Sequence, residues 1–368
     1  MINSYLFYII TVLLSTIFAE LAQKYSWINK SGKRVPHSFL WLISMAILIF
    51  VMGFRANSVG VDDLSYLKGY NIANSMGLIE YYETHVTEPG FYFLYRVVYL
   101  LFYNFQWLII LTSTITILCF YKALSYEIEN TRLALGVFIF SSTQYFYYFG
   151  IIRMGLAVSI IAIGYRYILE NKKKKYIYMV LLATMFHYSA LFALVLLFIK
   201  SNKNMQFKRN TIIKIALIIP LAFCSVRLLI YPFIMASRYQ RYIKSSGIIS
   251  TSFITSMPIF VLFLFHYNRF CVANRSYQFY FYLFIIKVFT EIFSPIIGIG
   301  RMVWYVNLSL CFLLPGTIRV NKNYFIKVIL LIFTILYCIF YSYNAYFGES
   351  YRSLFMLPYR NIFFEIAR

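Results

Sequence analysis

Nine charged or titratable side chains lie in or beside the polar segments that connect long apolar runs of this chain. They are Arg55, Asp62, Asp63, Glu88, Arg153, His187, Arg238, Arg241 and Arg301. A charge close to a membrane span is costly and therefore informative. Guanidinium groups bind diphosphates through paired hydrogen bonds, and carboxylates or histidines accept protons from hydroxyl groups. The set therefore indicates an anionic ligand and general-base chemistry. The adjacent aspartates and scattered histidines do not form a metal-ligand pattern, so we expect neither a metal site nor a cofactor.

The elements that position these side chains are membrane spans. The chain has 368 residues, of which 61% are hydrophobic and 12% charged, and its mean hydropathy is +0.71. This composition excludes an ordinary soluble domain. Apolar runs of about 17 to 20 residues recur, and each is long enough to cross a hydrocarbon core of about 30 Å as a helix. We predict an all-α, polytopic membrane protein of about 10–12 spans, with residues 1–368 forming a single membrane domain.

The basic residues indicate which loops share a side of the membrane. The formal net charge is +22, and lysines and arginines concentrate in short loops such as 24–34 and 172–175. Positive-inside bias explains this charge without a nucleic-acid partner and places these loops in the cytoplasm. Residues 55–90 then face outward. The arginines that this bias leaves unexplained collect on the outer face, which favours an anionic partner there.

Two external segments are expected to be something other than spans. Residues 55–105 should form an external loop followed by an interfacial helix, because Arg96 lies near the centre of the apolar stretch 91–105. Residues 232–252 should form an external basic loop after the span expected at 211–231.

Three further segments shape the expected topology. Residues 176–199 have basic loops on both sides, so positive-inside bias asks for an even number of crossings. Because the segment is too short for two full crossings, we expect a short or re-entrant hairpin with its tip near His187. Residues 133–150 and 302–318 are each expected to cross the membrane.

Each candidate also has an ordinary explanation. An arginine taken alone is equally well explained by contact with phospholipid headgroups or by an ion pair with a carboxylate of a loop. Arg153 is the best single candidate for ligand binding, because it lies between two spans with no other charge nearby. A lone histidine such as His187 is more often a satisfied core residue, although its ordinary pKa suits proton transfer. Asp62, Asp63 and Glu88 are the carboxylates able to act as a general base.

These positions resemble the EpsG-type branch of the Wzy-like polysaccharide polymerases. The matching motifs follow one another in order along nearly the whole chain: Arg55 to Asp63 with Tyr66 and Tyr70, Glu88-Pro89-Gly90 with Leu94, Ile152-Arg153 with Gly155 to Ala157, Phe186-His187 with Ser189-Ala190, Arg301-Met302, and Leu357-Pro358-Tyr359. Each motif alone is weakly specific, and together they are moderately specific. Met154 departs from the family pattern, in which a glutamine tends to follow the arginine.

The resemblance implies a fold related to the membrane-embedded, GT-C-like glycosyltransferases. It also implies a polymerase that joins lipid-linked oligosaccharide repeat units into O-antigen or a similar bacterial surface polysaccharide. The donor would be a growing chain on undecaprenyl diphosphate, and the reaction would occur on the periplasmic face of the bacterial inner membrane. A chain-length regulator protein is a candidate partner.

The resemblance also suggests roles for the candidate residues. Arg153 and Arg301 would bind the diphosphate and stabilise its charge as the glycosidic bond breaks. The catalytic base would be Asp62, Glu88 or His187, and the sequence does not rank the three. The remaining members of the set would contact the diphosphate or the sugar; they are Arg55, Asp63, Arg238 and Arg241.

Two other functions compete with polymerisation. An O-antigen ligase uses the same donor and transfers its glycan to a lipid A core, but the order of the motifs favours the polymerase. A flippase or other transporter usually has more spans, an internal repeat and a charged central path. Here the unexplained charge lies on one face and no repeat is visible, which disfavours transport.

Overall fold

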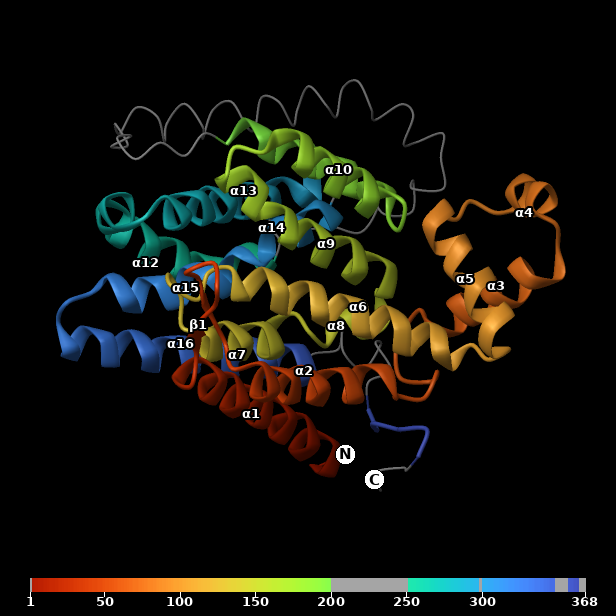
Figure 1. Cartoon of the computed structure of the whole chain (residues 1–368), viewed down its shortest axis with the longest axis horizontal. Coiled ribbons are helices and arrows are strands. Elements are labelled where there is room, and N and C mark those ends of the chain that lie inside the picture. Colours follow the sequence, from red (N-terminus) through yellow and green to blue (C-terminus); the bar gives the residue numbers. More distant parts are fainter. Residues whose placement is uncertain (1, 200–250, 298–299, 348–356, 364–368) are drawn as a thin grey trace.

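The computed structural model describes residues 2–199, 251–297, 300–347 and 357–363. Within these residues the chain is almost entirely helical, and the one regular sheet is a pair of two-residue strands, β1 (Trp27–Ile28) and β2 (Arg34–Val35) (Figure 1). The predicted all-α, polytopic class is confirmed.

Part of the predicted site lies outside the residues that the structure describes. Arg238 and Arg241 lie outside the described residues, as do the span expected at 211–231 and all but the last two residues of the basic loop expected at 232–252.

The helices pack in two groups. The first holds α1 (Ile2–Lys24), α2 (Ser38–Gly53), α6 (Gln106–Ser125), α7 (Leu133–Thr143) and α9 (Ile152–Leu169). In it, α6 lies between α2 and α9, and α1 packs on α2 and α7. The second group holds α12 (Thr251–Ala273), α13 (Arg275–Ile297), α15 (Ser309–Val320) and α16 (Tyr324–Phe347). The two groups meet where α15 and α16 pack on α7.

Burial separates central helices from peripheral ones. In the most apolar window of α9, 72% of the residues are buried, whereas the corresponding shares are 33% in α1 and 22% in α16. The exposed side chains of α1 and α16 are mostly large and apolar. Such faces are favourable in lipid and costly in water, so α1 and α16 belong at the lipid-facing rim.

Fewer described helices are long enough to span a membrane than the 10–12 expected. By length and composition, α1, α6, α9 and α16 qualify, and the bent pair formed by residues 300–307 and α15 makes a fifth. Other apolar segments are short: α2 has 16 residues and α7 has 11. At about 1.5 Å per residue, α7 extends over only about 17 Å.

Two expected spans are broken, and the breaks contact each other. The segment 133–150 divides at Gln144 into α7 and α8 (Tyr147–Gly150). The segment 302–318 divides into η3 (Gly300–Val303), α14 (Trp304–Asn307) and α15, with a bend of 42°. The Gln144 side-chain amide donates to the Asn307 carbonyl oxygen at 3.2 Å. A backbone group freed by a break in lipid needs such a partner, which explains why the breaks are paired.

The basic loops gather at one end of the molecule, which we call the basic end. Its segments are 20–34, 122–132, 166–175, 269–276 and 319–327. Contacts between loops join them: Asn274 bonds Asn130 through their side chains at 2.5 Å, and Arg275 donates to the Asn171 side chain at 2.8 Å. The loops that positive-inside bias groups on one side therefore share one end of the fold.

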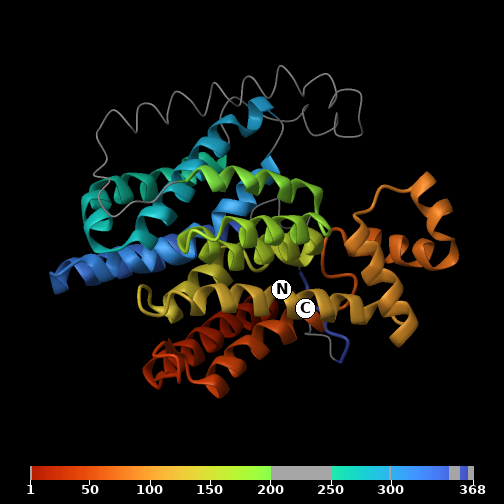
Figure 2. The same ribbon diagram turned by 45° about the horizontal axis from the view of Figure 1, so that its top comes forward.

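A small lobe forms the opposite end of the molecule (Figures 1 and 2). It consists of α3 (Asp63–Ser75), α4 (Leu78–Thr84) and α5 (Pro89–Phe102). α5 packs on α3, and the Arg96 guanidinium donates to the Ala73 carbonyl at 3.1 Å. With 14 residues, α5 is too short to cross alone. The interfacial position expected for residues 91–105 stays a prediction.

The expected hairpin is present in the stretch 176–199. α10 (Lys173–Thr184) leads to a turn at residues 185–187, and η1 (Tyr188–Phe198) returns beside it. The Tyr176 hydroxyl donates to the Ala193 carbonyl at 2.8 Å and joins the two arms. The tip of this hairpin lies against the lobe, because the Gly90 amide donates to the Met185 carbonyl at 2.8 Å.

Candidate functional site

A cavity of about 510 Å³ lies between the lobe, the hairpin tip, the start of α9 and η3. We call it the polar pocket. Five of the nine candidate residues line it: Asp62, Glu88, Arg153, His187 and Arg301. They come from five separate stretches of the chain, so their meeting is a property of the tertiary fold. The pocket and the basic end lie at opposite ends of the structure, about 30 Å apart along the 20 residues of α6.

Arg153 is held by a carboxylate and two aromatic rings. Its Nη1 donates to Glu88 Oε2 at 2.7 Å, and its guanidinium carbon lies 5.4 Å from the ring centroid of Tyr66 and 5.7 Å from that of Phe91. The Glu88 side chain is 7% exposed, whereas that of Arg153 is 30% exposed. The pair therefore fixes the direction of the guanidinium while leaving part of it open to the pocket.

The Glu88-Pro89-Gly90 motif explains why Glu88 reaches the pocket. Proline suits the first turn of a helix, and Glu88 precedes α5 in an extended conformation. A Cβ on Gly90 would lie 2.7 Å from the Met185 carbonyl oxygen, so only glycine allows α5 to approach the hairpin tip this closely. As a result, Glu88 Oε1 accepts a hydrogen bond from the Tyr188 amide at 3.4 Å.

His187 is a neutral side chain within a hydrogen-bonded chain. Its Nδ1 accepts from the Ser189 amide at 3.3 Å and contacts Ser189 Oγ at 3.0 Å, and Ser189 Oγ lies 2.9 Å from the Tyr305 hydroxyl. Burial lowers the pKa of His187 to about 4, although Glu88 opposes the shift. Since an amide can only donate, this network assigns the proton of the neutral ring to Nε2. His187 thus offers the pocket a hydrogen-bond donor.

Asp62 differs from the other carboxylate of the pocket. It precedes α3 and is partly buried, and within the described residues its carboxylate makes no hydrogen bond or ion pair. Burial raises its pKa, and the charges of Arg153 and Arg301 oppose that shift. A carboxylate with raised basicity beside two arginines is suited to accept a proton from a ligand that the arginines hold.

One known protein family matches most of this sequence. The sequence model of the EpsG family matches residues 38–361, which is most of the chain. The chain belongs to the EpsG family. Every side chain lining the polar pocket lies inside the matched range. Membership of this family indicates a membrane protein with a polysaccharide polymerase-like function. No curated protein and no solved structure matches the chain.

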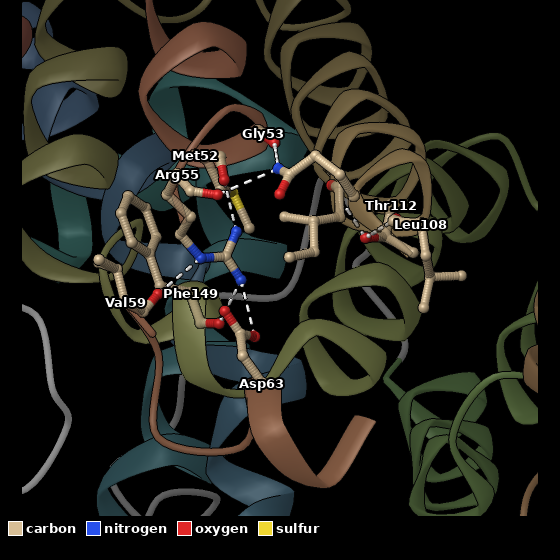
Figure 3. Close-up of polar contacts among 10 residues, drawn as sticks. Met52, Gly53, Arg55, Val59, Asp63, Leu108, Thr112 and Phe149 are labelled. Carbon is tan, nitrogen blue, oxygen red and sulfur yellow. Dashed lines mark hydrogen bonds and ion pairs between the residues drawn. The ribbon is translucent and has the colours of Figure 1, made fainter. Parts of the chain in front are cut away.

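Arg55 and Asp63, expected from the sequence to bind substrate, are not among the residues that line the polar pocket of this EpsG-family protein. They meet each other in a separate buried contact (Figure 3). Both side chains are 0% exposed, and Arg55 Nη2 lies 3.0 Å from Asp63 Oδ1. The guanidinium also donates to the Val59 carbonyl at 2.8 Å, the Phe149 carbonyl at 2.7 Å and the Met52 carbonyl. Through these contacts Arg55 joins the end of α2 to the start of α3 and to α8.

Gly60 makes this buried arrangement sterically feasible. Its φ of +151° favours glycine, and a Cβ there would lie 2.7 Å from Asp63 Oδ2 and 2.8 Å from the Phe149 carbonyl oxygen. Burial raises the pKa of Asp63 to about 6, with Arg55 opposing the shift. The pair therefore positions Asp62, its neighbour in the sequence, at the pocket wall.

Sequence reasoning missed two basic side chains of the pocket. Lys68 and His85 line it beside the predicted residues. Asp62, Tyr66 and Gly69 are spaced so that they lie on one face of α3, and Lys68 lies beside that face. This spacing was the signal that could have placed Lys68 near the pocket. Nothing in the sequence around His85 distinguishes it from a residue of a solvated turn.

A buried ion pair outside the pocket was also missed. Lys287 Nζ lies 2.6 Å from Glu291 Oε1 and 2.6 Å from Ser256 Oγ, and both charged side chains are at most 5% exposed. Their spacing of four residues in the apolar segment 279–297 was the signal. In the part of the chain that the structure describes, no group of three or more His, Cys, Asp and Glu side chains is placed to hold a metal ion.

Proposed function

We propose that this protein is a glycosyltransferase that polymerises a bacterial surface polysaccharide, with the polar pocket as its active site. The donor would be a growing glycan on undecaprenyl diphosphate, and the acceptor a second lipid-linked repeat unit. One observation carries the proposal: Arg153, Arg301 and Asp62 converge on one cavity from distant parts of the chain. Of these three, Asp62 is the carboxylate that has no hydrogen-bonding partner among the described residues.

The arginines bind the diphosphate in this proposal. Arg153 and Arg301 line the same pocket, so their charges offset the negative charge that develops on the leaving diphosphate. Glu88 acts as a positioning residue, because Arg153 and the Tyr188 amide occupy its two oxygens. This role differs from that of catalytic base, for which the sequence made Glu88 a candidate.

Asp62 is the general base in this proposal. An acceptor hydroxyl oxygen attacks the anomeric carbon of the donor, and Asp62 takes the hydroxyl proton. The bond between that carbon and the diphosphate oxygen breaks, and its electron pair leaves with undecaprenyl diphosphate. His187 donates a hydrogen bond from Nε2 to a sugar oxygen, because its Nδ1 is already an acceptor within the protein.

Charge distribution supports an external active site. The polar pocket lies at the end opposite the basic loops, and positive-inside bias places such loops in the cytoplasm. We therefore assign the pocket to the periplasmic face of the inner membrane, within a single membrane domain. A chain-length regulator protein remains a proposed partner on that side.

Deletion of the gene with complementation tests the proposal. Surface polysaccharide would be separated on a gel and lipid-linked intermediates measured for the wild type, Asp62→Asn and the control Glu83→Gln. Glu83 is an exposed carboxylate of α4 outside the pocket lining. We expect Asp62→Asn to leave glycans of one repeat unit, with a loss of long chains of about 10²- to 10⁴-fold, and Glu83→Gln to restore long chains.

Two outcomes would overturn the polymerase proposal, and a third would overturn the assignment of its base. Long chains that accumulate unattached on undecaprenyl diphosphate in the deletion strain would indicate a ligase. Single units trapped on the cytoplasmic leaflet would indicate a transporter. Full polymerisation by Asp62→Asn would remove Asp62 as the base.

A further inference from the structure

A second cavity lies at the basic end, far from the polar pocket. It has a volume of about 640 Å³ and is bounded by α1, α7, α15 and α16. It continues into a groove of about 350 Å³ between α1 and α16, with α7 as the floor. The two spaces share Glu20, Arg132, Leu135 and Leu331 in their linings. We call this continuous space the basic groove.

Cations without carboxylate partners surround the mouth of the basic groove. Within the described residues, no ion pair engages any of its four outer cations, which are Lys24, Arg34, Arg319 and Lys327. The fifth cation there, Arg132, is already paired with Glu20 at 2.6 Å. The mouth therefore carries a surplus of positive charge that an anion would neutralise.

The interior of the basic groove is apolar. Below the mouth its lining changes to aliphatic and aromatic side chains: Leu13, Ile17, Ala134, Leu135, Phe138, Leu331 and Ile335. From Lys327 to Ile335, eight residues of α16 extend over about 12 Å. One leaflet of the hydrocarbon core is about 15 Å thick. The groove therefore has the charge at its mouth and the apolar depth that a lipid of one leaflet requires.

We propose that the basic groove binds one phospholipid with an anionic headgroup. The phosphate lies among Lys24, Arg34, Arg319 and Lys327, and the acyl chains lie between α1 and α16 against α7. Basic pockets between membrane helices bind anionic lipids in this way. A helix of a second copy would also fill an apolar groove, but it would leave the four cations without counter-charge. This site is separate from the polar pocket and does not depend on the proposed function.

Native mass spectrometry of the purified protein tests the proposal with phosphatidylglycerol and phosphatidylcholine as probes. The groove variant carries Lys24→Gln, Arg34→Gln, Arg319→Gln and Lys327→Gln. The control removes the same charge from the same end, outside the groove lining, with Lys30→Gln, Lys173→Gln, Lys174→Gln and Lys322→Gln. We expect the wild type and the control to retain phosphatidylglycerol in preference to phosphatidylcholine. Each cation removed from the groove should weaken retention about fivefold.

A second variant tests the apolar part of the groove without changing charge. Ile335 is 37% exposed and lines the groove, so Ile335→Trp fills space without entering the core. We expect it to reduce phosphatidylglycerol retention about tenfold or more while the melting temperature in lipid-free detergent is unchanged. Equal lipid loss in the groove variant and the control would overturn the proposal. A dimer that dissociates on Ile335→Trp, with no retained lipid, would identify a second copy as the occupant instead.

Discussion

The Arg55–Asp63 pair and the Arg153–Glu88 pair have the same chemistry and opposite surroundings. In the first pair both side chains are 0% exposed, and the guanidinium is enclosed by backbone carbonyls (Figure 3). In the second pair Arg153 is 30% exposed and opens into a cavity. The enclosed pair is closed to a ligand because neither side chain is exposed, whereas the open pair leaves part of Arg153 accessible. Solvent access, and not residue type, therefore separates the enclosed pair from the pair that we propose for ligand binding.

The largest effect should come from breaking the enclosed pair. Arg55→Ala leaves the Asp63 carboxylate buried without its counter-charge, so we expect a loss of about 3–5 kcal/mol in the free energy of unfolding. Thermal unfolding of the purified protein and its abundance in membranes would measure this. The double variant Arg55→Ala with Asp63→Ala should recover part of the loss. A stable but inactive Arg55→Ala protein would contradict the structural role.

Breaking the open pair should abolish activity and spare the fold. We expect Arg153→Ala to reduce polymerisation about 10²- to 10³-fold, because a group that stabilises the leaving diphosphate is lost. Combining it with Glu88→Gln avoids leaving Glu88 as an unpaired charge, so stability can be compared fairly. Arg153→Lys should not restore activity, since an ammonium lacks the forked donors. Normal chain length in cells that carry Arg153→Ala would exclude diphosphate binding by this residue.

The contact that supports the open pair offers a smaller perturbation. Gly90→Ala places a methyl group against Met185, so we expect about 1–3 kcal/mol of destabilisation and a displaced Glu88. The matched control is Gly77→Ala, because nothing lies within 4 Å of a Cβ at Gly77. Melting temperature and polysaccharide length should change for Gly90→Ala only. Equal behaviour of the two variants would mean that the hairpin tip does not position Glu88.

The smallest effect should come from His187, which is already neutral. Because its pKa is lowered to about 4, we expect no change in polymerisation from titration of this residue between pH 6 and 8. His187→Gln should cost less than about tenfold, since an amide can donate in place of Nε2. A wild-type activity change centred near pH 6.5 that His187→Gln removes would show that the ring titrates.

The same shift predicts a pH dependence of stability. The unfolded chain binds a proton at His187 more readily than the folded chain does. The contribution of His187 to the free energy of unfolding is therefore fully present above about pH 6.5 and is lost as the pH falls toward 4. Asp62 and Asp63 have raised pKa values and act in the opposite direction. The difference in melting temperature between the wild type and His187→Gln, measured at pH 7 and pH 5, isolates the histidine contribution.

Much of the candidate site was predictable from local sequence. Asp62, Glu88, Arg153, His187 and Arg301 were identified because a charge beside an apolar segment is costly unless it has a purpose. The hairpin followed from basic loops on both sides of a segment too short for two crossings. These inferences depend on the composition of single segments, which is fully visible in the chain.

Other features required the assembled fold. The breaks at Gln144 and Asn307 are stabilised by a contact between residues that lie 163 positions apart. The burial of Arg55 depends on the Phe149 carbonyl, 94 positions away. Lys68 and His85 line the same pocket as Arg153 of α9, although all three come from separate stretches of the chain. No periodicity or motif within one segment records such contacts.

By itself, the sequence determined the helical membrane class and the grouping of the basic loops, and it singled out five of the side chains that line the polar pocket. The reason is that desolvation in lipid acts on each segment separately. The backbone of each segment of this chain that crosses hydrocarbon must be helical, and a charge there must have a compensating partner or a function. Only the tertiary structure decided that Arg55 is enclosed, that Arg153 is open and that Asp62 lacks a hydrogen-bonding partner among the described residues. Exposure and pairing are set by which distant segments pack together, and that depends on the whole fold.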